Sequence, residues 1–135
     1  MTRPTFQEIY MNLATDLARR STCLRKQVGC VIVSEDFTHV LGVGYNGNAA
    51  GFPNTCDSDE VGNCGCLHAE DSCLNKVAVG KEIKKIIFVT LSPCTYCAKR
   101  FVNKGGIQKV YYHEEYRKRE GLDVLDKAGI PYERI

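Results

Sequence analysis

The stretch that decides the fold is Ile86–Tyr112, with the sequence IIFVTLSPCTYCAKRFVNKGGIQKVYY. It opens with the apolar run Ile86–Leu91, which has the length and composition of a fully buried strand. Ser92-Pro93 is a helix-start signal, and Gly105-Gly106 ends the helix that follows. A second apolar run, Val110–Tyr112, predicts another strand. Two strands joined by a crossover helix predict a parallel pair within one sheet.

Six further elements are expected along the chain: a helix over 4–20, strands over Val28–Val33 and His39–Val43, a helix over 68–80, a helix over Tyr116–Ala128 and a strand over Tyr132–Ile135. The first helix is amphipathic, and the two strands after it flank a turn-like segment and predict a hairpin. Residues 46–66 are rich in glycine and show no periodicity, so they predict a long loop. The order of elements predicts an α/β protein, with a mixed sheet that carries helices on both faces.

Length and composition limit the possible classes of protein. The 135 residues have room for one domain, 1–135, around a single core. Hydrophobic residues make up 44% and charged residues 25%, the balance of a globular protein rather than of a disordered or fibrous one. No apolar run reaches the roughly 20 residues of a membrane-spanning helix, and Glu8 and Asp16 interrupt any signal peptide. We therefore expect a cytoplasmic protein, in the host cytoplasm if the source is viral.

The charge of the chain gives little reason to expect a polyanionic partner. Lys and Arg total 18 against 16 for Asp and Glu, a net charge of +2. One basic cluster, Tyr116-Arg117-Lys118-Arg119, is flanked by Glu115 and Glu120. We interpret it as the solvated start of a helix rather than as a nucleic-acid contact.

Two short motifs stand where helices are expected to begin: His68-Ala69-Glu70 and Pro93-Cys94-Thr95-Tyr96-Cys97. Cys94 and Cys97 are three apart in a first helical turn, so both sulfurs project to one side and can bind one ion. His68 supplies a third ligand if the two helix starts lie side by side. Three protein ligands leave one tetrahedral position open for water, which is the arrangement of a catalytic zinc.

Glu70 lies two residues beyond His68 and need not be a ligand. A carboxylate at this distance can take a proton from a water molecule at the open position and return it to a nitrogen of the substrate. Each motif alone is weak, but H-x-E followed by P-C-x-x-C is the pattern of zinc-dependent nucleobase deaminases. A zinc-binding interaction module without catalysis has no use for this carboxylate, which disfavours that alternative.

The chain resembles the cytidine/deoxycytidylate deaminase superfamily, and within it the branch that acts on deoxycytidylate (dCMP). The residues that carry the resemblance are Val28-Gly29-Cys30-Val31-Ile32-Val33, Gly44-Tyr45-Asn46-Gly47, His68-Ala69-Glu70, Thr90–Lys99 and Gly129-Ile130. The resemblance implies a three-layer α-β-α sandwich with a five-stranded sheet. It also implies hydrolytic deamination of dCMP at C4, which releases ammonia and supplies dUMP for thymidine nucleotide synthesis.

The resemblance also implies roles for individual residues. His68, Cys94 and Cys97 would hold the catalytic zinc, and Glu70 would shuttle protons. The remaining contacts would be the Ala69 N–H to the pyrimidine O2, the Ser92 carbonyl to the leaving amino group, Asn46 to a sugar hydroxyl and Tyr116 near the base. Arg25 and Lys26 are candidates for the 5′-phosphate by position only. For Tyr116 and Arg25, ordinary surface side chains are an equal alternative.

Six of the eight cysteines lie outside the catalytic pair. Cys30 and Cys73 fall in apolar elements and are interpreted as small core residues. The others, Cys23, Cys56, Cys64 and Cys66, occur in loop or helix-end segments, and four thiolates suit a closed structural zinc site. Some dCMP deaminases carry a second zinc in this region. The alternative is a set of unpaired buried thiols.

Other substrates and partners remain open at this point. The alternatives to dCMP are dCTP, cytidine, or a base in tRNA or single-stranded DNA. The near-neutral charge disfavours nucleic acid. The resemblance further implies a homo-oligomer, often a hexamer, with dCTP as activator and dTTP as inhibitor.

Overall fold

The computed structural model describes residues 2–60 and 63–135. In chain order, its helices and strands are α1 (Phe6–Ala18), β1 (Gly29–Ser34), β2 (Val40–Tyr45), α2 (Ala69–Leu74), β3 (Lys85–Leu91), α3 (Thr95–Lys104), β4 (Ile107–Glu114), α4 (Glu120–Ala128) and β5 (Tyr132–Arg134). Their types and order confirm the sequence prediction.

The five strands form one sheet in the order β2-β1-β3-β4-β5. Strand β1 pairs antiparallel with both β2 and β3, whereas β3, β4 and β5 run parallel to one another. The sheet is therefore mixed, as the two helical crossovers in the second half of the chain require. The predicted parallel pair corresponds to β3 and β4.

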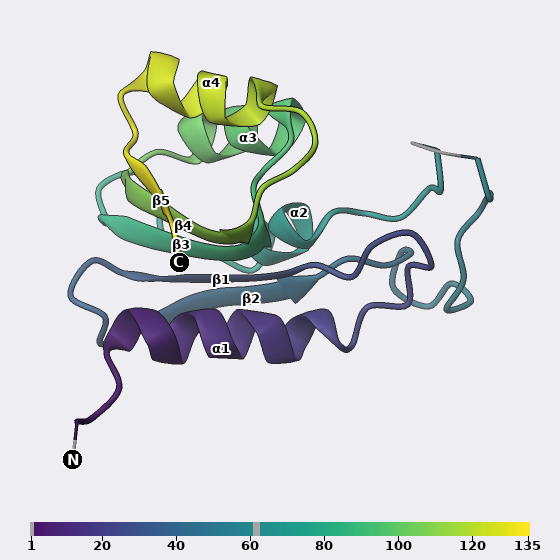
Figure 1. The fold of residues 1–135 in the computed structure, drawn as a ribbon, viewed down its shortest axis with the longest axis horizontal. Coiled ribbons are helices and arrows are strands. Elements are labelled where there is room, and N and C mark those ends of the chain that lie inside the picture. The colour runs from purple at the N-terminus through teal and green to yellow at the C-terminus, as the bar shows by residue number, and fades with distance from the viewer. Residues whose placement is uncertain (1, 61–62) are drawn as a thin grey trace.

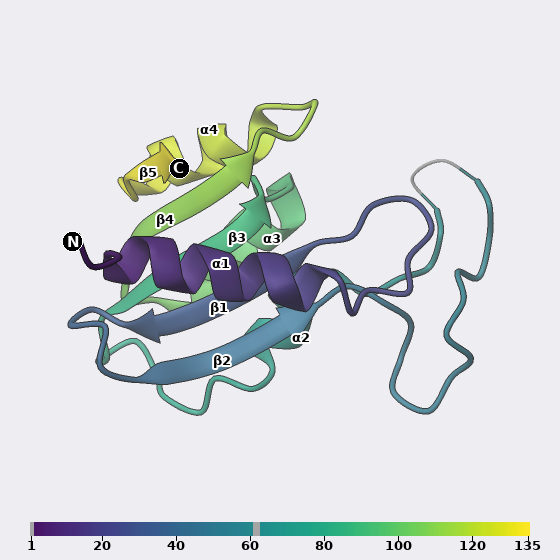
Figure 2. The same cartoon turned by 60° about the horizontal axis from the view of Figure 1, so that its bottom comes forward.

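Helices cover both faces of the sheet and make three layers (Figure 1). Side chains alternate along β1, so Val31 and Val33 pack with Met11 and Ala14 of α1 on one face. Ile32 faces the opposite side, where Ala69 of α2, Phe101 of α3 and Leu125 of α4 complete the larger core. The expected α-β-α sandwich is confirmed. Figure 2 shows α1 lying along the sheet on its own face.

Two predicted helices are shorter than expected. The helix expected to run to Gly80 ends at Leu74, with Asn75 as its C-cap. The helix expected to begin at Tyr116 begins at Glu120, so the cluster 116–119 lies in a loop and not on a helix. In contrast, β4 is longer than predicted and extends to Glu114. The loop that follows β4 therefore starts at the edge of the sheet.

Two glycines allow close helix packing. A Cβ on Gly44 of β2 would lie 2.6 Å from the Ala69 carbonyl oxygen, so α2 rests directly on the backbone of the strand. A Cβ on Gly121 would lie 1.8 Å from the carbonyl oxygen of Pro93, so α4 begins against the segment between β3 and α3. Neither approach is possible for a residue with a side chain. Both contacts fix helix starts at one edge of the sheet.

The long loop was predicted over residues 46–66, and its described parts, 46–60 and 63–66, extend beyond the sheet at this same edge (Figures 1 and 2). Gly47 and Leu67 pair as an isolated bridge, which closes the base of the loop. Within residues 2–60 and 63–135, no helix has the length and apolar character needed to cross a membrane.

Candidate metal centre and active site

The two sequence motifs meet at the starts of α2 and α3. His68 is the N-cap residue of α2, and Cys94 is the N-cap residue of α3. Ser92 and Pro93 connect β3 to α3, and the backbone of Cys94 is extended, as is usual for an N-cap residue. Because α2 and α3 pack on the same face of the sheet, their first turns lie next to each other. The predicted juxtaposition of the helix starts is therefore present.

His68, Cys94 and Cys97 form a compact group of donor atoms. The Nδ1 atom of His68 lies 3.2 Å from the Cys97 sulfur and 3.5 Å from the Cys94 sulfur. In a tetrahedral zinc site, usual bond lengths separate an imidazole nitrogen from a thiolate sulfur by about 3.5 Å. The distances fit one zinc ion bound through Nδ1 and two sulfurs. One tetrahedral position would stay open to the pocket.

Hydrogen bonds among these three side chains shift their pKa values in different directions. Hydrogen bonding to Cys97 is the main cause that lowers the pKa of the Cys94 thiol, to about 4. A hydrogen bond with Cys94 raises the pKa of His68 to about 9, although burial opposes this shift. Cys94 is thus a thiolate, the protonation state that a zinc ligand requires, and it is paired with His68. The hydrogen bond with Cys94 and burial raise the pKa of Cys97, so binding of zinc would have to displace protons from Cys97 and His68.

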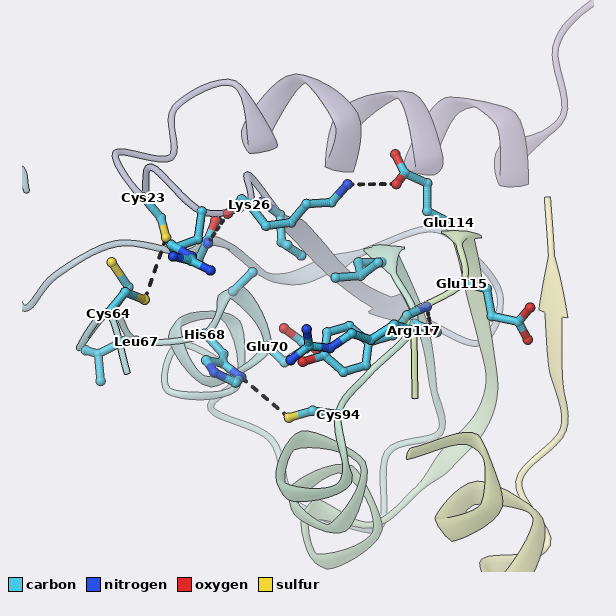
Figure 3. Close-up of a pocket in the computed structure, with 18 residues that line it drawn as sticks. Cys23, Lys26, Cys64, Leu67, His68, Glu70, Cys94, Glu114, Glu115 and Arg117 are labelled. Carbon is cyan, nitrogen blue, oxygen red and sulfur yellow. Dashed lines mark hydrogen bonds and ion pairs between the residues drawn. The ribbon is translucent and has the colours of Figure 1, made fainter. Parts of the chain in front are cut away.

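Glu70 lies in the first turn of α2 and is almost completely buried, with 5% of its surface exposed. Burial is the main cause that raises the pKa of its carboxyl to about 7. The side chain faces the pocket beside His68 rather than the surface (Figure 3). A buried carboxyl in this position can take up and release a proton without serving as a ligand.

A pocket of about 560 Å³ opens above these residues. This volume lies within the range of sites that hold small molecules. Its lining includes all six residues that the sequence nominated for substrate contacts: Arg25, Lys26, Asn46, Ala69, Ser92 and Tyr116. The structure brings these residues to one cavity with Glu70 and the proposed ligands His68 and Cys94 (Figure 3).

The contacts of three nominated residues qualify their predicted roles. Asn46 is buried, accepts a hydrogen bond from the Val28 N–H at 2.8 Å and donates to the Lys26 carbonyl. Its amide thus also fixes the entry into β1. The Arg25 guanidinium donates to the Asp59 carbonyl at 2.9 Å.

Lys26, the third of these residues, has an acidic partner at the pocket wall. Its ammonium forms an ion pair of 2.7 Å with Glu114 at the end of β4. The pair joins two segments that are far apart in the sequence. A phosphate at this point would have to compete with Glu114 for Lys26.

Arg117 is a pocket residue that the sequence analysis missed. It was assigned to a solvated helix start, but it lies in the loop before α4 and lines the cavity. No ion pair to Arg117 is present within residues 2–60 and 63–135. No sequence signal locates it, because its position depends on Ser92, whose buried hydroxyl accepts a hydrogen bond of 2.6 Å from the Tyr116 N–H. This bond holds the loop over the pocket.

The four remaining loop cysteines converge at the side of the same pocket. The Cys23 sulfur lies 3.8 Å from those of Cys56 and Cys64, and Cys56 and Cys66 are 3.6 Å apart. All four sulfurs lie within 4.8 Å of one another. Four thiolates around one zinc at the usual bond length are about 3.8 Å apart. The set fits a closed zinc site.

The environment of this cluster favours a thiolate at Cys23, whereas burial and hydrogen bonds with the neighbouring cysteines raise the pKa of Cys66. Although burial opposes it, backbone N–H groups of Lys26 and Arg25 help to lower the pKa of Cys23 to about 7. The Leu24 N–H donates to the Cys56 sulfur at 3.4 Å. Such N–H donors are typical of the surroundings of bound thiolates. Cys30 and Cys73, in contrast, are fully buried in the core, as predicted.

Known proteins share this fold over most of the chain. The crystal structure of a dCMP deaminase from the cyanophage S-TIM5, in complex with dCMP and dUMP, covers 100% of both chains at 35% identity, with a TM-score of 0.86. The deoxycytidylate deaminase of Mycobacterium phage D29 is 32% identical, over 85% of this chain and 99% of its own length.

Cellular relatives are longer. The deoxycytidylate deaminase of Saccharomyces cerevisiae is 37% identical over 95% of this chain. The chain spans only 44% of the length of that protein. Residues 4–114 match the family described as the cytidine and deoxycytidylate deaminase zinc-binding region, which includes both motifs. The chain therefore belongs to the cytidine and deoxycytidylate deaminase family.

Proposed function

We propose that this protein is a zinc-dependent deaminase that converts dCMP and water into dUMP and ammonia. The observation that carries the proposal is the buried Glu70 beside the group of His68, Cys94 and Cys97, at a pocket of about 560 Å³. The similarity to deoxycytidylate deaminases of phage and yeast supports dCMP as the substrate.

The residues around the pocket account for each part of the reaction. Zinc held by the His68 imidazole and the two thiolates would supply the Lewis acidity that makes water nucleophilic at neutral pH. Glu70 takes the proton of the attacking water and passes it to the ring N3. It carries the second proton to the amino nitrogen at C4, so that ammonia leaves as the new C4 carbonyl forms. Ala69 and Ser92 line the pocket where backbone groups can orient the base.

The pocket wall carries both charges, with Glu114 and Glu115 beside Arg25, Lys26 and Arg117, and Arg117 is the candidate to bind an anionic group. Arg117 lines the pocket and has no carboxylate partner in the part of the chain that the structure describes. A guanidinium suits a phosphate because its planar donors match two oxygens at once. We assign the 5′-phosphate to Arg117 in preference to Lys26, which is already paired with Glu114. Arg25 lines the same pocket and adds a second positive charge.

We also propose a second zinc at Cys23, Cys56, Cys64 and Cys66. The sulfur distances of 3.6–3.8 Å support it. A closed four-thiolate site is structural, since no position remains for substrate. It would fix the long loop, which ends at Cys66 only two residues before the ligand His68.

The regulation of the enzyme depends on its assembly and not on the residues of one pocket. From the family resemblance we infer that the protein forms a homo-oligomer, such as a hexamer. We also infer that dCTP activates it and that dTTP inhibits it. Two ligands that select opposite states of an oligomer would make the rate sigmoidal in dCMP without dCTP and nearly hyperbolic with it. If neither nucleotide changes the dependence of rate on dCMP concentration, the proposed regulation is refuted and the proposed deamination is unaffected.

The decisive experiment is a panel of dCMP, CMP, cytidine, dCTP and a cytosine-containing oligonucleotide, with ammonia release as the readout. We expect dCMP to be the best substrate by kcat/KM, and the oligonucleotide to be inert. Arg117→Gln should raise KM for dCMP and leave cytidine unchanged, with the exposed Lys118→Gln as the matched control. Equal efficiency on dCMP and cytidine in the parent would refute a phosphate site at the pocket mouth.

A further inference from the structure

An ion pair connects the two helices that carry the metal centre. Asp71 of α2 and Arg100 of α3 approach to 2.6 Å between Oδ1 and Nη1. Asp71 follows Glu70 directly and lies three residues beyond His68, while Arg100 lies three residues beyond Cys97. The two side chains therefore join the helical turns from which the metal ligands and the proton carrier project.

The pair is better placed than an ordinary surface ion pair. The Asp71 side chain is 16% exposed and that of Arg100 is 37% exposed. The buried Oδ1 atom of Asp71 accepts no hydrogen bond in the part of the chain that the structure describes, so the ion pair with Arg100 is what compensates its charge. The Arg100 guanidinium lies over the ring of Tyr96, 5.7 Å from its centroid, and donates to the Tyr96 hydroxyl at 3.3 Å. These contacts with Tyr96 restrict the guanidinium, which reduces the entropy cost of its pairing with Asp71.

Helix α2 packs closely on β2 at Gly44, but its position relative to α3 needs a further restraint. It has only six residues, and His68 makes no side-chain cap for it. Within residues 2–60 and 63–135, no other ion pair links α2 to α3. A metal site tolerates displacements of only about 0.5 Å in its ligands, so the relative position of two separate helix starts must be fixed by neighbouring contacts.

We propose that Asp71 and Arg100 are positioning residues, which hold the starts of α2 and α3 at the separation that zinc binding and the proton transfers of Glu70 require. This inference rests on the zinc centre of the proposed function. It assigns no contact with the substrate to either residue. Its main effect is on how firmly the folded protein retains zinc.

The test compares Asp71→Asn, Arg100→Gln, the double variant and Arg100→Lys by the rate at which a chelator removes zinc from the folded protein. The ion at the catalytic centre is identified as the one that a His68→Ala variant does not carry. We expect both single variants to release this zinc about tenfold faster, as is usual for residues that orient metal ligands. The double variant should release zinc no faster than Arg100→Gln alone. Arg100→Lys keeps the positive charge and should release zinc more slowly than Arg100→Gln.

A matched control is Glu133→Gln, which breaks the Lys109–Glu133 pair of 2.7 Å between β4 and β5, on strands that contribute no metal ligand. Its zinc should be released at the parental rate. Turnover should fall about tenfold in Asp71→Asn, with KM for dCMP within about twofold of the parent.

Three results would overturn the proposal. The first is an unchanged rate of zinc release in both single variants, and the second is a rate in the double variant that equals the product of the two single effects. The third is an equally faster release of zinc from Glu133→Gln. A pair that only supported folding would lower the melting temperature of the metal-free chain and leave zinc release from the folded protein unchanged. Because zinc release is measured without substrate, its outcome is independent of whether dCMP is the substrate.

Discussion

The four-cysteine cluster gives the most quantitative prediction, which is tested by Cys64→Ser. Zinc at this cluster would join Cys23 to Cys64, 41 positions further along the chain. It would also anchor Cys56 and Cys66 on the same ion. Serine removes one thiolate with little change in volume and leaves the other three sulfurs without the tetrahedral set that makes the site tight.

The loss of stability can be worked out from the chain length of the link. For a closed loop of 41 residues, the chain-entropy relation gives a stabilisation of about 4 kcal/mol. An unfolding entropy of about 2.1 cal/mol/K per residue gives about 280 cal/mol/K for 135 residues. The variant should therefore melt about 14 °C below the parent. Activity at 25 °C should fall less, because the catalytic ligands remain in place.

Elemental analysis and thermal melting test this prediction together. The parent should carry two zinc ions per chain and Cys64→Ser one. Cys30→Ala is the control, since Cys30 is fully buried but belongs to neither cluster, and it should keep both ions. One zinc per chain in the parent, with Cys56→Ser and Cys64→Ser melting at the parental temperature, would refute the reasoning.

Three further substitutions test single side chains. Glu70→Ala should keep its zinc and fold but lose about 10²–10⁴-fold in kcat, and activity within a few-fold of the parent would remove Glu70 from the mechanism. Ser92→Ala should raise KM for dCMP several-fold with little change in kcat, because the Ser92 hydroxyl holds the loop that carries Arg117; a fall in kcat alone would contradict this. Lys85→Met should destabilise the protein by about 2–4 kcal/mol in urea unfolding, since the buried ammonium donates to the carbonyls of Gly80, Ile83 and Gly105. Lys84→Met, at the exposed neighbouring position, is the control and should unfold like the parent.

Local sequence signals predicted the elements well but their ends less well. The apolar run at β3 and the Ser92-Pro93 signal gave the crossover correctly, because burial and backbone chemistry act over a few residues. The end of α2 at Leu74 was missed, since the apolar Val77 continues the helical pattern but packs into the core from a turn. Tertiary packing overrode the periodicity there.

The position of Arg117 was missed for a similar reason. Its neighbours Lys118 and Arg119 are exposed, and composition alone made the whole cluster a solvated helix start. In the structure α4 begins at Glu120, and Gly121 in its first turn packs against the Pro93 carbonyl. The preceding loop is then held by Ser92. These two contacts join segments about 25 residues apart, which no local pattern could reveal.

The directions of the strands explain why distant motifs meet at one edge. Gly29 at the start of β1 pairs with Tyr45 at the end of β2, because those strands are antiparallel. Strand β1 is also antiparallel to β3, so the end of β3 reaches the same edge, and parallel pairing brings Glu114 at the end of β4 beside Leu91. Four connecting segments therefore leave the sheet together, and they carry Arg25, Asn46, Cys94 and Arg117, respectively.

The sequence alone could not establish this convergence, because hydrophobic patterns predict strands but not which strands are neighbours. The decisive fact is that β1 lies between β2 and β3. If β1 instead lay at the outer edge of the sheet, the segment with Cys23 would be separated from β3 and the metal ligands that follow it. The order of strands thus places the cysteine cluster, the phosphate-binding candidates and the metal centre around a single pocket. The function proposed for the chain depends on that order as much as on the motifs.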